Sequence, residues 1–169
     1  DKFTLKAQEI IQSSQELADR LGHQQIEPEH IVRTMLQLRD GIVPPLLGKL
    51  GINQGQLEKD MEAALGRLPR ISGEGAGQTY LSSRAKAVLD QASKEAEQMK
   101  DKFVGLEHIL MAIVDEGGDA SEILVRNGAS RDALLRVLAD IRGGHQITDQ
   151  NPEDKYQALE RVSQDLTAM

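Results

Sequence analysis

Two short phrases, IEPEHI at residues 26–31 and VGLEHI at residues 104–109, carry the same Glu-His-Ile core. A shift of 78 residues places Glu29 on Glu107, and the His and Ile that follow then coincide as well. A phrase repeated at a fixed separation indicates an internal duplication, so the same shift should align the rest of the two halves.

The two halves do align outside the phrase. The same shift matches Ala7 with Ala85, and past the middle loop a shift of 77 matches Gly51 with Gly128. Between the copies lies RLPRISGEGAGQ, whose glycines and proline are typical of a surface connection. We therefore predict repeat one at residues 1–68 and repeat two at residues 79–142.

Both copies show helical patterning. Apolar residues recur at three- and four-residue spacing, and residues suited to N-caps precede the runs. The expected caps are Thr4, Asn53, Ser82 or Ser83, and Ser130, with a further capping box formed by Asp119 and Glu122. No stretch alternates strictly enough to predict a strand. The predicted fold class is all-α: two pseudo-symmetric four-helix repeats, followed by a C-terminal linker helix.

The composition excludes several classes of function. Aromatic residues make up 2% of the 169 residues and the net charge is −7, which argues against nucleic-acid binding. No apolar run approaches the roughly 20 residues that span a bilayer, so we expect no membrane segment. The absence of cysteine fits a reducing compartment, and we expect a cytoplasmic protein.

The repeated Glu-His pairs suggest acid–base chemistry, a metal site or a structural role. Neighbouring helical residues do not converge on one ion, and the four His of the chain offer few zinc ligands. A general acid–base pair would also need a nucleophile or a third partner. We therefore expect each Glu to lie at a helix N-terminus and each His to bond across to a neighbouring helix. No catalytic residue, metal ligand or cofactor site is predicted in this chain.

The end of the chain differs from both repeats. Gly143 and Gly144 open a polar run, and we predict a hinge at residues 143–152. Beyond Pro152, apolar residues recur on one face of an expected helix at residues 153–169. We interpret this helix as the start of a following module.

These features together resemble a known family. FTLKAQEIIQSSQELADRLGHQQIEPEHI, answered by YLSSRAKAVLDQASKEAEQMKDKFVGLEHILMAI, is similar to the N-terminal double repeat of the Clp family of AAA+ unfoldases. The tail RGGHQITDQNPEDKYQALERVSQDLT resembles the linker and first ATPase-module helix of the ClpB-type disaggregases. The resemblance implies a parent that is a homohexameric ring, uses ATP and Mg in downstream modules, and cooperates with the DnaK system.

The resemblance also implies where clients would bind. The family's polar trio near the substrate-contacting surface falls on Thr4, Asp101 and Glu107. An apolar groove of some relatives falls on Leu89, Gln91, Glu95 and His108, of which only Leu89 is apolar. The remaining candidates for apolar contact are Tyr80, Leu81 and Leu89.

Two functions from this resemblance stay open. In the first, the chain is a substrate-recognition domain, monomeric in isolation, that weakly captures apolar segments of unfolded or aggregated proteins. In the second, it is a docking module for an adaptor of a protease-coupled Clp unfoldase. An independent enzyme is the weakest alternative, because it rests on the Glu-His pairs alone.

Overall fold

The computed structural model describes residues 2–39, 41–70, 79–143, 145–148 and 150–152. The predicted helix at 153–169 and Gly144 of the predicted hinge lie outside these residues. Within the described residues, no helix is long and apolar enough to cross a membrane.

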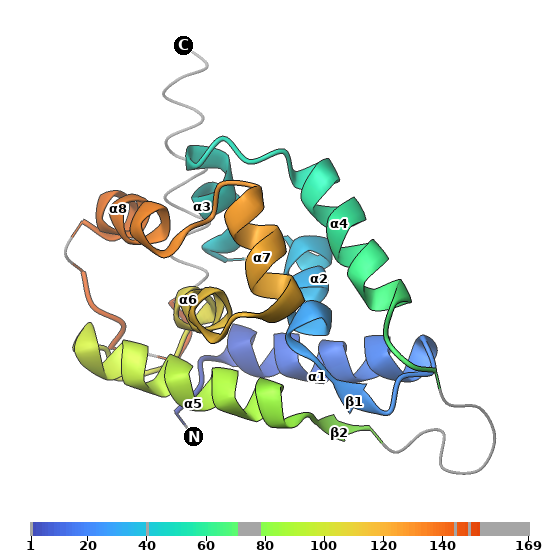
Figure 1. Cartoon of the computed structure of the whole chain (residues 1–169). Helices are drawn as coiled ribbons and strands as arrows, with labels where there is room; N and C mark the ends of the chain where they lie inside the picture. Colours follow the sequence, from blue (N-terminus) through green and yellow to red (C-terminus); the bar gives the residue numbers. More distant parts are fainter. Residues whose placement is uncertain (1, 40, 71–78, 144, 149, 153–169) are drawn as a thin grey trace.

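The described residues of each repeat form four helices and one very short strand. Repeat one consists of α1 (Leu5–Arg20), β1 (Gln25–Ile26), α2 (Pro28–Leu38), α3 (Val43–Lys49) and α4 (Gln54–Gly66). Repeat two consists of β2 (Tyr80–Leu81), α5 (Ser83–Gln98), α6 (Leu106–Glu116), α7 (Gly118–Arg126) and α8 (Arg131–Arg142). The predicted pair of four-helix repeats is confirmed (Figure 1).

Most of the predicted caps form. Thr4 Oγ1 accepts a hydrogen bond from Ala7 N–H at 3.2 Å, and Ser82 Oγ accepts one from Ala85 N–H at 3.0 Å. Asn53 and Ser130 cap α4 and α8 in the same way. The box at Asp119 is wrong: α7 begins after Gly117, and Asp119 already lies in its first turn. Gly117 has φ +84°, a conformation that favours glycine and lets α6 and α7 follow each other directly.

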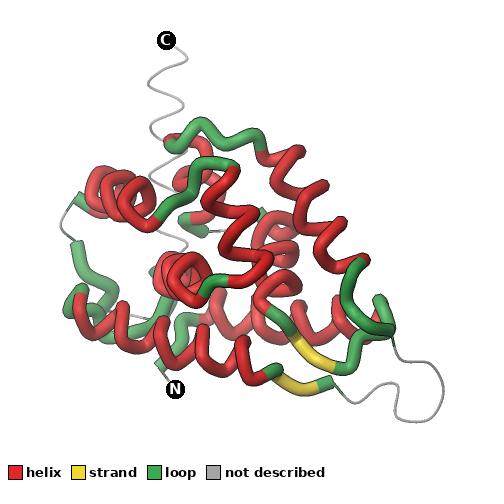
Figure 2. Tube along the Cα trace, in the orientation of Figure 1, coloured by secondary structure: helices red, strands yellow, loops and turns green. Residues whose placement is uncertain are grey.

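The expectation of no strands is also wrong. β1 and β2 pair in parallel, with Gln25 opposite Tyr80 and Ile26 opposite Leu81, as the yellow segments of Figure 2 show. Two residues are too few to show an alternating pattern in a sequence.

A second, isolated bridge joins Phe3 to Val104. Under the shift of 78 residues, Phe3 corresponds to Leu81 and Val104 to Ile26. Hydrogen bonds repeat the same correspondence: Thr4 N–H donates to the Val104 carbonyl at 3.0 Å, and Ser82 N–H donates to the Ile26 carbonyl at 3.1 Å. Each repeat therefore ties the start of its first helix to the other repeat.

One continuous aliphatic core runs through both repeats. It is shared because α4 packs against α7 and α3 packs against α8, contacts that Figure 1 displays across the middle of the molecule. The largest fully buried side chains come from both halves: Ile10, Ile31, Met35, Ile42, Leu46, Leu47, Leu57, Met61, Leu106, Ile109, Leu110 and Met111.

Candidate functional site

The predicted polar trio lies where the N-terminal segment meets the start of α6. Thr4 caps α1, and its N–H also donates to the carbonyl of Val104, the residue before the N-cap of α6. Glu107 lies in that first turn. Asp101 lies in the loop between α5 and α6. The side chains of Asp101 and Glu107 are buried, as is Thr4.

Asp101 is the centre of a buried hydrogen-bond network. Its carboxylate accepts from Arg142 Nη1 and Nη2 at 2.9 and 2.5 Å, from His108 Nε2 at 2.7 Å and from Ile147 N–H at 2.8 Å. Burial raises the pKa of Asp101, but the bonds from His108, Arg142 and Ile147 outweigh it and bring that pKa down to about 2. Asp101 is therefore ionised and fixed in place at neutral pH.

The same arginine links Asp101 to Glu107. Arg142 Nη1 lies 3.9 Å from Glu107 Oε2, yet neither oxygen of Glu107 has a hydrogen-bond partner within the described part of the chain. Gly105 makes room for this side chain, because a Cβ on Gly105 would lie 2.5 Å from Glu107 Oε1. The carboxylate thus keeps its capacity to accept hydrogen bonds.

Glu29, the counterpart of Glu107 in repeat one, is similar. It is buried in the first turn of α2, and its Oε2 has no partner among the described residues. Burial raises the pKa of Glu29, while its own backbone N–H and Arg84 counteract that rise. Buried acceptors without hydrogen-bond partners are uncommon. Among the described residues, the first turns of α2 and α6 each contain a buried carboxylate with such an acceptor.

The two repeated His side chains bond to nearby loop residues, and the expected bonds to a neighbouring helix are not found among the residues that the structure describes. His30 Nδ1 accepts from Glu27 N–H at 2.9 Å, and His108 Nδ1 accepts from Gly105 N–H at 2.8 Å. Each Nε2–H is then the donor, His30 to His23 at 2.8 Å and His108 to Asp101. Through these hydrogen bonds, each ring holds in place the loop that precedes its own helix.

The apolar candidates do not form one patch with the trio. Tyr80 is 50% exposed on β2, whereas Leu81 and Leu89 are half-buried and pack against the core. β2 directly precedes α5 and Asp101 follows it, so the 16 residues of α5 separate Tyr80 from Asp101 by about 24 Å. An exposed apolar residue close to the trio is Leu5, which is 52% exposed and was not predicted.

The positions of the family's apolar groove are polar and paired here. Glu95 accepts from Arg131 at 2.7 and 2.9 Å and from Gln91 Nε2 at 3.2 Å. His108 is committed to Asp101. Only Leu89 is left to offer apolar surface at this place.

A groove in repeat one was also missed from the sequence. It has a volume of about 660 Å³ between α1, α2 and α4, and Leu17, Leu21 and Leu65 line it together with three arginines. Its leucines are spaced as core residues, so their pattern alone gives no sign of an open surface.

The described residues contain no group of three or more His, Asp or Glu able to hold a metal ion. The buried polar clusters pair acids with bases already engaged in hydrogen bonds.

Comparison with known proteins gives the family. The Clp repeat (R) N-terminal domain family matches residues 2–127. Chaperone protein ClpB of Nitratidesulfovibrio vulgaris is 39% identical over 171 residues, covering 98% of this chain and 20% of that protein. ClpB of Bacillus anthracis is 35% identical over 170 residues, covering 99% and 20%. The chain spans about a fifth of the length of these curated relatives.

Solved structures give the fold independently. The Hsp104 N-terminal domain from Candida albicans superposes with a TM-score of 0.79 at 24% identity, covering 90% of this chain and 99% of that one. The N-terminal domain of the ClpV1 ATPase from E. coli superposes with a TM-score of 0.72 at 18% identity, covering 90% and 91%. The chain belongs to the Clp repeat N-terminal domain family and is similar to the ClpB chaperones within it.

Proposed function

We propose that this chain is the substrate-recognition domain of a ClpB-type disaggregase, which weakly captures exposed apolar segments of aggregated or misfolded proteins. The observation that carries the proposal is the extent of the ClpB similarity. It reaches 98–99% of the chain and so includes the tail beyond residue 142, whereas the match to the family ends at residue 127, within repeat two.

The proposal extends to the longer protein of which this chain would be one domain. The domain contributes recognition and no catalysis. ATP and Mg bind in downstream modules of a cytoplasmic homohexamer that works with the DnaK system. A weak single site suffices in such a ring, because six copies raise the effective concentration at which a client is held. A hinge at Gly143 and Gly144 would let the domain deliver the client to the ring.

The exposed apolar side chains indicate where capture begins. Tyr80 combines a large apolar ring with a hydroxyl, and such side chains are enriched at protein interfaces. Leu5 offers a second exposed contact at the trio.

The test is an NMR titration with a permanently unfolded polypeptide. We expect chemical-shift changes near Thr4, Leu81, Leu89 and Asp101, and none with the same molar amount of a folded control protein. Tyr80→Ser should weaken binding about fivefold through lost apolar contact, whereas Val125→Ser should not. Val125 is a matched control, because it is 46% exposed on α7 and was not predicted to bind.

The adaptor-docking alternative makes a different prediction. Immobilised domain would then retain one folded partner in stoichiometric amount instead of a heterogeneous set of misfolded proteins. That result, or equal chemical-shift changes with the folded control, would overturn the capture proposal.

A further inference from the structure

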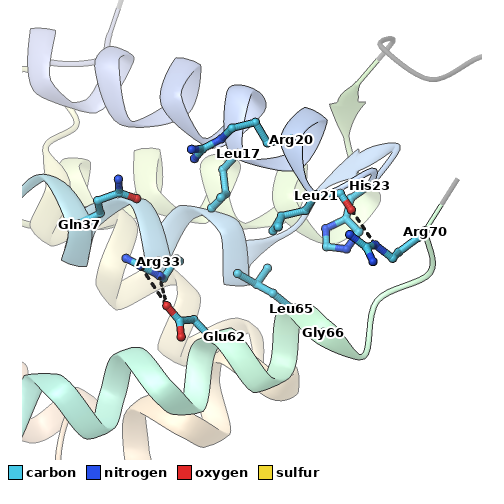
Figure 3. A pocket seen from close by; sticks show the side chains of 10 residues that line it. All are labelled: Leu17, Arg20, Leu21, His23, Arg33, Gln37, Glu62, Leu65, Gly66 and Arg70. Carbon is cyan, nitrogen blue, oxygen red and sulfur yellow. Dashed lines mark hydrogen bonds and ion pairs between the residues drawn. The ribbon is translucent and has the colours of Figure 1, made fainter. Parts of the chain in front are cut away.

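The groove of repeat one combines an apolar floor with a basic rim. Figure 3 shows Leu17 and Leu65 facing the same space from α1 and α4, with Leu21 beside them. Its volume of about 660 Å³ falls within the range of about 300–1,000 Å³ typical of ligand sites. The groove is therefore large enough for several side chains of a bound segment.

The side chains that line this groove carry more positive than negative charge. Arg20, Arg33 and Arg70 line it from α1, α2 and the segment after α4, and Glu62 is the one acidic residue among its lining residues. Glu62 is engaged by Arg33 at 3.1 Å. In the described part of the chain, Arg20 and Arg70 form no ion pair, although Arg70 Nε donates to the Leu21 carbonyl at 3.1 Å. In a chain of net charge −7, such a surplus of cations is a local feature.

Repeat two has different residues at the positions that correspond to the leucines of the groove. The counterpart of Leu17 is Glu95, which is buried and paired with Arg131. The counterpart of Leu65 is Arg142, which is buried and paired with Asp101. Repeat two thus neutralises its charges at this place with its own side chains. Repeat one has leucines there instead, beside Arg20 and Arg70, which form no ion pair with the described residues.

We propose that the groove between α1, α2 and α4 is a separate binding site for an extended peptide segment that carries carboxylates beside aliphatic side chains. Leucine side chains of such a segment pack on Leu17, Leu21 and Leu65. Its carboxylates accept charge-assisted hydrogen bonds from Arg20 and Arg70. A purely apolar client would leave both arginines without a partner, so charge complementarity selects the acidic segment.

The site is distinct from the one proposed for capture. It lies wholly in repeat one and includes none of Thr4, Tyr80, Leu89, Asp101 or Glu107. Loss of binding at one site therefore does not imply loss at the other, and the two proposals fail separately.

The test uses three short labelled peptides that alternate leucine with glutamate, with glutamine or with lysine, measured by fluorescence anisotropy and NMR. The glutamate peptide should bind best, lose affinity as salt is raised and shift the amides of Leu17, Gln37 and Leu65. The double variant Arg20→Gln/Arg70→Gln should weaken it about tenfold through loss of two charge-assisted contacts.

The matched control is Lys94→Gln/Arg136→Gln, which removes the same charge from exposed positions on α5 and α8. It should leave affinity within about twofold, because distant exposed charges are screened. Equal loss in the control, or equal binding of the glutamine peptide, would overturn the proposal. So would displacement of the peptide by inorganic phosphate with the same amide shifts, or self-association of the chain that protects Arg20 and Arg70.

Discussion

At the scale of single residues, the repeated histidine makes the same hydrogen bond through Nδ1 in both repeats and a different one through Nε2. In both repeats Nδ1 caps the loop before the helix. Nε2 meets a neutral partner, His23, in repeat one and a carboxylate, Asp101, in repeat two. The pKa values of His30 and Asp101 are both lowered in the folded chain, so each of these two residues makes stability depend on pH in its own range.

His30 should make the domain less stable in mild acid. Burial, and then the adjacent His23, lower the pKa of His30 to about 4. The unfolded chain takes up a proton near its ordinary value of 6.5, so stability is full above that pH and falls as the pH drops towards 4. We expect a loss on the order of 2 kcal/mol across this range, measured by urea unfolding. His30→Gln should flatten the slope, and exposed His145→Gln should not; an unchanged slope in His30→Gln would contradict the assignment.

Asp101 should affect the stability of the fold at a lower pH than His30 does. The pKa of Asp101 is brought to about 2 in the folded state, so its stabilisation is present above its unfolded value near 3.8 and is lost as the pH falls through 2. Asp101→Asn should cost about 3 kcal/mol at pH 7, because it removes the carboxylate that Arg142 contacts at 2.5 and 2.9 Å inside the protein. Asp90→Asn, on an exposed position of α5, should cost less than about 0.5 kcal/mol. Equal unfolding midpoints for the two variants would rule out a stabilising Asp101–Arg142 pair.

At the scale of elements, the chain after α8 is held more closely than its composition indicates. Gly143 ends α8 with φ +57°, as a C-terminal glycine should. Beyond it, Ile147 is 1% exposed, and Lys102 N–H donates to its carbonyl at 2.8 Å. Gln150 O accepts from Leu5 N–H at 2.9 Å. The hinge at 143–152 stays a prediction, and motion within 145–152 would have to break these bonds.

Ile147→Ala measures how firmly this segment is docked. We expect a loss of about 2 kcal/mol, at the low end for a buried isoleucine because a surface segment can close the gap. The amide hydrogens of Lys102 and Ile147 should also exchange faster in the variant. Val125→Ala, a half-exposed aliphatic control, should change neither quantity by much. Fast exchange of both amides already in the unmodified chain would show that the segment is free, as a hinge requires.

At the scale of the whole molecule, the sequence predicts what depends on local pattern. The helix starts at Thr4 and Ser82 follow from capping chemistry, and the register of the duplication follows from Glu29 and Glu107. What it misses depends on contacts between distant segments. Arg142 gives no hint of its pairing with Asp101, because its counterpart Leu65 is apolar. The groove is missed for the same reason: Leu17 and Leu65 have the spacing of core residues.

Separating the repeats tests the shared core. We expect residues 1–70 alone to lack a stable monomeric fold, because α4 and α3 would lose α7 and α8 and expose their apolar faces. Mixing residues 1–70 with residues 79–152 should restore the helical circular dichroism and the dispersed NMR spectrum of the intact chain. A folded monomer of residues 1–70 would show instead that each repeat carries a sufficient core of its own.

The reciprocal bridges, Phe3 to Val104 and Leu81 to Ile26, have a consequence for the origin of the fold. Each joins the same two positions of the repeat, taken once from each copy. A single ancestral unit would have found both partners only in a second molecule of itself, in the isologous arrangement of a two-fold dimer. Gene duplication would then have joined the two subunits in one chain, so that their association no longer depended on concentration. Once joined, the halves were free to diverge, and one site closed with internal ion pairs while the other stayed open.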